Sequence, residues 1–385
     1  MSTAKDMERL IGRLAAERVP GCGVQVMQRG QMLCESYAGF ADLETGTPIT
    51  RDSVYRQASM SKLPLYTTLM MLFERGKFLM NDPIANFLPE YAQSTVAVKQ
   101  PNGYAVRRPA ARPINFRDVL SMKCGLPYCN VPAETCDATL EAMQKAMRPL
   151  WEKDWFSLRE QVRAIAAVPL EFDPGTHWLY GFSSELAAAL IEVICDKPID
   201  DVFREMLFEP LGMEHTWSSV PQEEQKNLVR LYAKATDGSY GPANFFAGSG
   251  RQSGWARLSS TIGDYTRLMQ MLANGGVFAG RQLIGRKTID LMRENGLTPA
   301  MVKSDFLDTY ERGYGYGCGV RTLISNADGD SNGTLGAFGW TGGFGTYCEA
   351  DPAEGLSIVY MHNLLPDDEI YCHLRVRNTA YGLVE

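Results

Sequence analysis

The sequence predicts an α+β fold, in which strands from both ends of the chain build one sheet and a mostly helical region lies between them. Three observations support this prediction. Apolar and polar residues alternate within residues 22–41, apolar residues recur at helical spacing through residues 115–215, and strand-like segments return after residue 313. We find neither an internal repeat nor a linker that cleanly divides the 385 residues. The expected division is a sheet domain at 1–60 and 245–385 and a mostly helical domain at 61–244.

The N-terminal part of the chain contains two predicted strands between two predicted helices. The strands fall within residues 22–41, and Arg29-Gly30 supplies the turn between them. Leucines share one face of the segment 61–75, which predicts a helix that Gly76 terminates. The first helix is amphipathic and is predicted by four apolar residues at helical spacing, Met7, Leu10, Ile11 and Leu14.

The rest of the chain carries clear local signals. A small hairpin is predicted at 95–108, because Asn102-Gly103 supplies a turn between two alternating segments. Ser157 and Glu160 have the spacing of a capping box, and Ser183 begins another predicted helix. The remaining predicted elements are helices at 259–273 and 286–294 and strands at 313–319, 343–349 and 356–362.

The composition is that of an acidic globular protein. With 38 Lys and Arg against 45 Asp and Glu, the net charge of −7 argues against a nucleic-acid partner and a polybasic membrane anchor. The N-terminal segment lacks the apolar core of a signal peptide, and no apolar run approaches the length of a membrane span. Nine cysteines without a Cys-x-x-Cys pair argue against a disulfide framework or a zinc site. We therefore expect a cytoplasmic protein with no nucleic-acid or membrane partner and no bound metal.

Several common catalytic signatures are absent from the sequence. It has no phosphate-binding Gly-x-x-x-x-Gly-Lys loop and no Gly-x-Gly-x-x-Gly fingerprint, which argues against the usual nucleotide sites. The four histidines form no His-Glu-x-x-His pattern. The single Gly-x-Ser-x-Gly match, Gly329-Asp330-Ser331-Asn332-Gly333, does not stand between a predicted strand and a predicted helix, as a nucleophile elbow would. A serine that attacks acyl groups in this chain would therefore be activated by a group other than histidine.

Ser59-Met60-Ser61-Lys62 supplies such a group at the start of a predicted helix. Residues at i and i+3 lie on one face of a helix, so the Lys62 amine can hydrogen-bond the Ser59 hydroxyl. The amine can also accept the hydroxyl proton where burial lowers the lysine pKa. Taken alone, the spacing is weak evidence, because Ser2 and Lys5 share it and a plain helix N-cap is an alternative role for Ser59.

A series of short segments around Ser59 strengthens the case. They are Pro20-Gly21, Gly39-Phe40-Ala41-Asp42, Gly46-Thr47-Pro48, residues 53–59 with Lys62, Asp82-Pro83, residues 114–126, Pro174-Gly175-Thr176, and Glu209-Pro210-Leu211-Gly212-Met213. In this order they resemble the serine β-lactamase and penicillin-binding-protein superfamily, whose signature begins with Ser-x-x-Lys. The resemblance spans residues 20–365 and is greatest for the class C β-lactamase-like branch, which includes the family VIII carboxylesterases. It implies an antiparallel sheet flanked by helices beside a mostly helical domain, catalysis through an acyl-enzyme, and no cofactor.

Two further motifs of that superfamily are altered here. Tyr180-Gly181-Phe182 stands at the Tyr-x-Asn position, where the resemblance implies that Tyr180 relays a proton beside Ser59. Phe182 replaces an asparagine that would bind a substrate amide. Trp340-Thr341-Gly342-Gly343 stands at the Lys-Thr-Gly position, so tryptophan replaces a lysine that helps to receive a substrate carboxylate. By resemblance, the backbone N–H groups of Ser59 and Gly343 form the oxyanion hole.

These departures favour a small ester or an activated acyl group as the substrate, because such molecules need neither the carboxylate receptor nor the asparagine. Lys62 and Tyr180 are expected to take the Ser59 proton, and the choice of general base between them stays open. An apolar acyl pocket is expected around Trp178, Tyr180, Phe182 and Trp340. The full set of expected substrate-binding residues is Trp340, Thr341, Gly342, Phe182 and Trp178.

The sequence leaves two alternatives to a carboxylesterase or acyltransferase. The first is a β-lactamase or D-Ala-D-Ala carboxypeptidase that uses another carboxylate receptor. The second is a catalytically weak binding protein that keeps the fold. Retention of Ser59, Lys62 and Tyr180 together argues against the second alternative. In every case the partner is a small ester, acyl compound or β-lactam, and the oligomeric state is not predicted.

Overall fold

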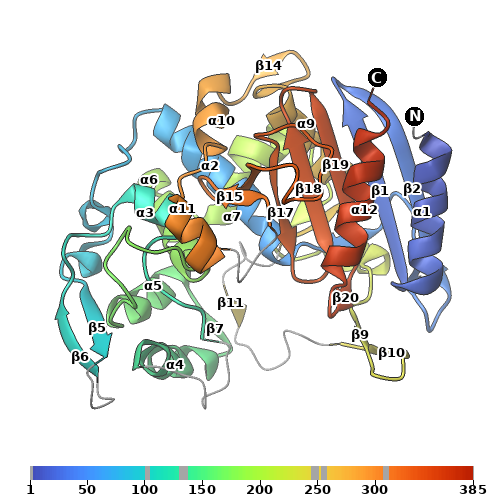
Figure 1. The fold of residues 1–385 in the computed structure, drawn as a ribbon. Coiled ribbons are helices and arrows are strands. Elements are labelled where there is room, and N and C mark those ends of the chain that lie inside the picture. Colours follow the sequence, from blue (N-terminus) through green and yellow to red (C-terminus); the bar gives the residue numbers. More distant parts are fainter. Residues whose placement is uncertain are drawn as a thin grey trace.

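The computed structural model describes residues 3–99, 105–129, 138–243, 251–252, 258–306 and 312–384. Its centre is an eight-stranded antiparallel sheet with the order β15-β16-β17-β18-β19-β1-β2-β3 (Figure 1). The N-terminal β1 pairs with the C-terminal β19, so both ends of the chain build one sheet. The strands are β1 (Gly21–Gln28), β2 (Gln31–Asp42), β3 (Thr47–Pro48), β15 (Tyr314–Tyr316), β16 (Arg321–Leu323), β17 (Phe338–Gly342), β18 (Thr346–Asp351) and β19 (Leu356–Met361).

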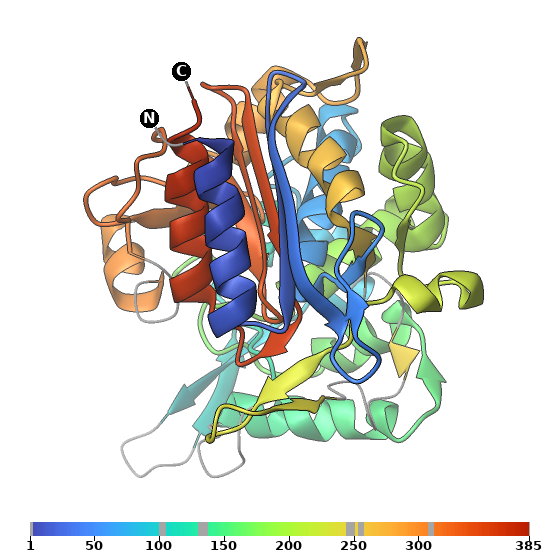
Figure 2. The ribbon, with the colours of Figure 1, turned by 90° about the vertical axis from the view of Figure 1, so that its right-hand side faces the viewer.

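Helices cover both faces of this sheet. Figure 2 shows α1 (Ala4–Glu17) and α12 (Glu369–Tyr381) side by side on one face, with α9 (Ile262–Ala273) on the other. Every residue of β18 and β19 is buried, as expected for strands covered on both sides. Helix α1 buries the four apolar residues that predicted it. The α+β prediction is therefore confirmed.

The C-terminal helix α12 has no counterpart among the predicted elements. Its buried face carries His373 and Arg377 at positions where a helical pattern would show apolar residues. Both polar side chains donate to backbone carbonyls, since His373 Nε2 bonds to the Gly345 oxygen and Arg377 to the Gly329 oxygen. The hydrophobic pattern therefore does not reveal this helix.

The helical region is centred on α2 (Lys62–Glu74), which is buried over nearly its whole length and packs against α6 (Ser183–Cys195). A short 3-10 helix, η1 (Ala58–Ser61), leads directly into α2. Around this pair lie further α-helices and a π-helical turn, η5: α3 (Phe116–Leu120), α4 (Ala138–Trp151), α5 (Leu158–Ala166), α7 (Ile199–Phe203), η5 (Arg204–Phe208) and α8 (Glu209–Leu211). Helix α5 begins with the predicted capping box, in which the Ser157 hydroxyl accepts from the Glu160 N–H.

Small sheets of two or three strands complete the fold. The predicted hairpin is present as β5 (Thr95–Lys99) and β6 (Ala105–Pro109), and its Asn102-Gly103 turn lies outside the described residues. One three-stranded sheet contains β4 (Val54–Arg56), β12 (Ser259–Thr261) and β8 (Thr216–Trp217), and another contains β10 (Tyr240–Pro242), β9 (Tyr232–Lys234) and β20 (Leu364–Leu365). Two further pairs are β7 (Trp155–Phe156) with β11 (Arg251–Gln252) and β13 (Val277–Phe278) with β14 (Arg281–Gln282). The remaining helical elements are α10 (Arg286–Met292), α11 (Pro299–Met301), η2 (Ile84–Asn86), η3 (Pro89–Tyr91), η6 (Gln222–Asn227) and η8 (Val302–Phe306).

Three predicted boundaries are wrong. The strand predicted at 313–319 is confined to Tyr314–Tyr316, because the chain bends at 318–320 before β16. The helix predicted from residue 259 begins at Ile262, because residues 259–261 pair with β4 and β8, and the Thr261 side chain caps the helix. The strand predicted from residue 343 begins at Thr346, because residues 343–345 form a hairpin loop. The predicted domain boundary at 244/245 lies outside the described residues, and the division into two domains stays a prediction. Among the described helices, none has both the length and the apolar character needed to cross a bilayer.

Candidate active site

Ser59 lies where the chain turns sharply from β4 into α2. The turn depends on Ala58, whose φ of +47° is a left-handed conformation that costs an alanine about 1–2 kcal/mol. The backbone on either side of Ser59 is held by hydrogen bonds. Gln57 N–H donates to the Leu258 oxygen over 2.9 Å, and the Tyr265 hydroxyl donates to the Met60 oxygen over 2.6 Å. Ser59 is thus fixed, half-buried, at the entrance to a buried helix.

Lys62 directs its amine back to Ser59. Nζ donates to the Ser59 Oγ over 3.2 Å, and the lysine is only 4% exposed. The rings of Tyr180 and Tyr128 flank the amine, with centroids 4.7 and 5.7 Å from Nζ. When Lys62 is neutral, the same contact lets the amine accept the serine proton.

Tyr180 enters the same group from the segment before α6. Leu179 N–H donates to the Met122 oxygen over 2.9 Å, and Phe182 N–H donates to the Leu126 oxygen over 2.8 Å. Between them, a Cβ on Gly181 would lie 2.0 Å from the Leu126 oxygen, so only glycine allows this close approach. The segment is thereby clamped on both sides of the tyrosine ring.

Trp340 reaches Tyr180 from the central sheet. Its indole Nε1 donates to the Tyr180 hydroxyl over 3.2 Å, and the two ring centroids are 5.5 Å apart. The indole ring also packs edge-on against Tyr316 of β15. Although Trp340 is 1% exposed, its one polar group is directed at the hydroxyl that the sequence analysis singled out.

The other two expected aromatic residues are buried supports of this group. Trp178 is 3% exposed, and its ring lies edge-on to those of Phe306 and Tyr316. Phe182 is 6% exposed, is the N-cap residue of α6, and packs edge-on against Tyr128. Both therefore lie beside Tyr180.

The loop between β17 and β18 lies against the backbone just before Ser59. The Thr346 hydroxyl donates to the Gln57 oxygen over 3.1 Å, and a Cβ on Gly342 would lie 2.2 Å from that oxygen. A Cβ on Gly343 would meet nothing within 4 Å, so this residue borders open space. Thr341 belongs to the opposite face of the strand from Trp340, and its hydroxyl helps to lower the pKa of the Glu369 carboxyl on α12. The structure therefore brings Gly342 toward Ser59 and directs the Thr341 side chain elsewhere.

Two residues of this neighbourhood were missed by the sequence analysis. Tyr128 follows the matched segment 114–126 by two residues, and only its place in space identifies it. Glu185 lies in the first turn of α6 and is fully buried. Burial raises the pKa of its carboxyl to about 7, and the positive charge of Lys62 opposes part of that rise. A carboxyl that titrates near neutrality thus acts electrostatically on Lys62.

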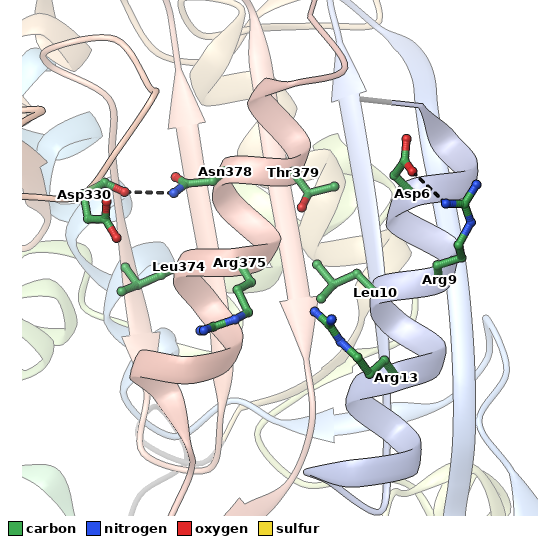
Figure 3. Close-up of a pocket in the computed structure, with 9 residues that line it drawn as sticks. All are labelled: Asp6, Arg9, Leu10, Arg13, Asp330, Leu374, Arg375, Asn378 and Thr379. Carbon is green, nitrogen blue, oxygen red and sulfur yellow. Dashed lines mark hydrogen bonds and ion pairs between the residues drawn. The ribbon is translucent and has the colours of Figure 1, made fainter. Parts of the chain in front are cut away.

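Other features of the described residues lie apart from this site. No three His, Cys, Asp or Glu side chains in the described part of the chain are grouped so as to hold a metal ion. A pocket of about 730 Å³ opens between α1 and α12, on the other face of the sheet from α2 (Figure 3). Arg9, Arg13 and Arg375 border it, but Arg9 pairs with Asp6 and Arg375 stacks on Tyr371.

Comparison with known proteins supplies the context for this geometry. The family model described as Beta-lactamase matches residues 4–381 of the chain. Protein Rv1367c of Mycobacterium tuberculosis is 27% identical over 357 residues, which cover 90% of this chain and 86% of that protein. Esterase EstB of Burkholderia gladioli is 23% identical over 377 residues, which cover 91% of this chain and 87% of the esterase.

A solved structure shows the same fold. The structure of EstCE1, described as a hydrolase with promiscuous acyltransferase activity, has a TM-score of 0.80 to this chain. The two are 21% identical, and the match covers 98% of each chain. The antiparallel sheet flanked by helices, beside a helical region, is therefore the architecture shared by the two proteins.

Proposed function

The chain belongs to the beta-lactamase family, and from this premise we propose that it is a serine hydrolase or acyltransferase of small esters or activated acyl groups. The observation that carries the proposal is the 3.2 Å contact between Lys62 Nζ and Ser59 Oγ at the start of a buried helix. In this proposal Ser59 is the nucleophile, and an acyl-enzyme on its Oγ is the intermediate.

The proposed reaction has two stages. In the first, Ser59 Oγ attacks the substrate carbonyl, its proton passes to Lys62 or Tyr180, and the leaving alcohol takes up a proton. In the second, water or another acceptor attacks the acyl-enzyme and the serine regains its proton. The backbone N–H groups of Ser59 and Gly343 are the proposed donors to the oxyanion, and loss of one such donor costs about 10²–10³ in rate in a known protease.

The residues around Tyr180 support the proposed substrate class. Trp340 and Phe182 provide no charge and no amide at the positions where a β-lactam or a D-Ala-D-Ala peptide would be held. The indole N–H of Trp340 already donates to Tyr180. A neutral acyl chain loses nothing from these replacements, and burial against aromatic rings would favour it. The esterase and hydrolase names of EstB and EstCE1 support this reading.

A stopped-flow assay with p-nitrophenyl butyrate tests the proposal. We expect a burst of p-nitrophenol followed by steady turnover, both abolished by Ser59→Ala. Ser2→Ala is a matched control, because Ser2 has the same spacing to a lysine and should be dispensable. Equal rates in the wild type and Ser59→Ala would contradict the esterase proposal. Parallel assays with nitrocefin and a D-Ala-D-Ala peptide would then distinguish a β-lactamase or carboxypeptidase from a binding protein.

A further inference from the structure

The loop that carries Gly343 is short and sharply bent. Residues 343–345 connect Gly342 of β17 to Thr346 of β18, and Gly345 N–H donates to the Gly342 oxygen over 2.8 Å. Gly345 has a φ of +97°, which places it outside the range that other residues adopt readily. The direction of the Gly343 N–H depends on how firmly this three-residue loop is held.

Two histidines contact this loop, His362 directly after β19 and His373 on α12. A Cβ on Gly345 would lie 1.8 Å from the His362 Nε2, so the imidazole of His362 lies directly against the loop backbone. His373 Nε2 donates to the Gly345 oxygen over 3.1 Å. The segment that follows β19 adds a third contact, in which Leu364 N–H donates to the Phe344 oxygen over 2.9 Å.

His362 is a neutral part of this support. Burial lowers the pKa of its imidazole to about 3, and the neighbouring His373 contributes to the shift. Its Nε2 lies 2.6 Å from the Asp367 oxygen and must carry the proton there, while Nδ1 accepts from the Tyr360 hydroxyl over 3.0 Å. Both ring nitrogens are therefore engaged, which fixes the ring under Gly345.

His373 is fixed in turn by Glu369, one helical turn earlier on α12. Glu369 lies 3.7 Å from the His373 Nδ1 and 3.7 Å from Arg321 of β16, which are ion-pair distances rather than hydrogen-bond distances. Burial alone would raise the pKa of Glu369, but His373, Arg321 and the Thr341 hydroxyl lower it to about 2. Tyr347 stacks on the His373 ring with centroids 5.0 Å apart. Glu369 is thus a half-buried anion that lies between His373 and Arg321.

Two residues of α12 therefore act on either side of Gly343. The Thr341 hydroxyl, two residues before Gly343, helps to lower the pKa of Glu369, and His373 Nε2 donates to the Gly345 oxygen, two residues after Gly343. Figure 1 shows α12, in red, lying over the sheet beside β19, the strand against which it packs. We propose that Glu369 and His373 are positioning residues, which fix the 343–345 loop and thereby the direction of the Gly343 N–H in the oxyanion hole. This inference rests on the proposed role of Gly343.

The test compares His373→Leu, which removes the donor to Gly345, with His373→Gln, whose amide N–H can replace it. The readouts are kcat and KM for p-nitrophenyl butyrate and the Ki of butaneboronic acid, a reversible tetrahedral mimic on a catalytic serine. For His373→Leu we expect kcat to fall and Ki to rise by about 10- to 100-fold each, with KM nearly unchanged. His373→Gln should recover most of both losses. His215→Leu, at an exposed histidine away from the site, is the matched control.

A purely structural role predicts a different result. His373→Leu would then lower the unfolding midpoint but leave kcat and Ki unchanged below it, and that outcome would overturn the inference. If His373→Leu does not fold, Thr341→Val removes the hydroxyl that acts on the Glu369 carboxyl, with little change in shape. It should move kcat and Ki in the same directions, and unchanged values would again overturn the inference. A wild type without a Ser59-dependent burst would instead refute the proposed function.

Discussion

Trp340 Nε1 donates a hydrogen bond to the Tyr180 hydroxyl over 3.2 Å, and this contact joins the central sheet to the helical region at the candidate active site. The donor occupies the position at which the superfamily signature has a lysine. A neutral N–H stabilises a tyrosinate less than an ammonium does, but it fixes the direction of the hydroxyl lone pairs. In the proposed reaction Trp340 would therefore orient Tyr180 without adding a charge that attracts substrate carboxylates.

Trp340→Phe should lower kcat for p-nitrophenyl butyrate by about 10-fold, because one neutral hydrogen bond contributes about 0.5–1.5 kcal/mol and the hydroxyl also loses its orientation. The phenyl ring keeps the packing against Tyr316, so KM should change little. Steady-state kinetics measure both constants. Trp217→Phe on β8 is the matched control, and equal losses in the two variants would count against an orienting role for Trp340.

Trp340→Lys should introduce β-lactam turnover. An ammonium at this position could receive the carboxylate that the wild type leaves without a charged partner, and ionic hydrogen bonds are about twice as strong as neutral ones. We expect nitrocefin hydrolysis to rise at least about 10-fold while ester turnover falls. Trp340→Met opens similar space without a charge and should not raise it. An equal rise in both variants would assign the effect to space rather than charge.

The contact between Ser59 and Lys62 is the part of the site that local sequence rules can supply, because i and i+3 residues on a helix meet whatever surrounds them. The place of Tyr180 beside them came only from the resemblance to the superfamily. Tyr128 and Glu185 come from segments with no periodicity or motif that relates them to Lys62. Only the packing of α2 against α6 brings Glu185 close to the lysine.

The fold shows the same limit. The strands β1 and β19 both overlap segments that the sequence predicts as strands, but their pairing across the whole chain is a property of the tertiary structure. Helix α12 escaped prediction because His373 and Arg377 occupy its buried face. Those polar residues are used for contacts to backbone oxygens, which hydrophobic periodicity does not encode.

Glu185 predicts a pH dependence of stability. Its pKa is about 7 in the folded state against its ordinary value of 4.5, so between these values the folded state binds more protons than the unfolded state. The free energy of unfolding should therefore fall as the pH rises from about 4.5 to about 7, by about 3 kcal/mol from this group. Below that window the loss is absent, and above it the loss is complete.

Urea unfolding of the wild type and Glu185→Gln across this pH range measures the effect. As the pH rises from about 4.5 to about 7, the unfolding free energy of the wild type should fall relative to that of Glu185→Gln, whose amide does not ionise. Glu223→Gln, at an exposed glutamate, should keep the wild-type pH slope. Parallel slopes in the wild type and Glu185→Gln would show that the buried carboxyl does not titrate in this range.

Gly345→Ala should separate the backbone requirement of the β17–β18 loop from its contact with His362. At Gly345 the alanine meets both a φ of +97° and an imidazole atom 1.8 Å from its Cβ. At Gly46 the φ is +69° and a Cβ meets nothing within 4 Å, so Gly46→Ala carries the strain alone, about 1–2 kcal/mol. We expect Gly345→Ala to lose clearly more unfolding free energy in urea than Gly46→Ala.

Gly345→Ala should also lose ester turnover in conditions where it is still folded. Both ring nitrogens of His362 are hydrogen-bonded, so relief of the clash should displace the loop that carries Gly343. If Gly345→Ala and Gly46→Ala lost equal unfolding free energy and Gly345→Ala kept full ester turnover, the His362 ring would have moved without disturbing the loop.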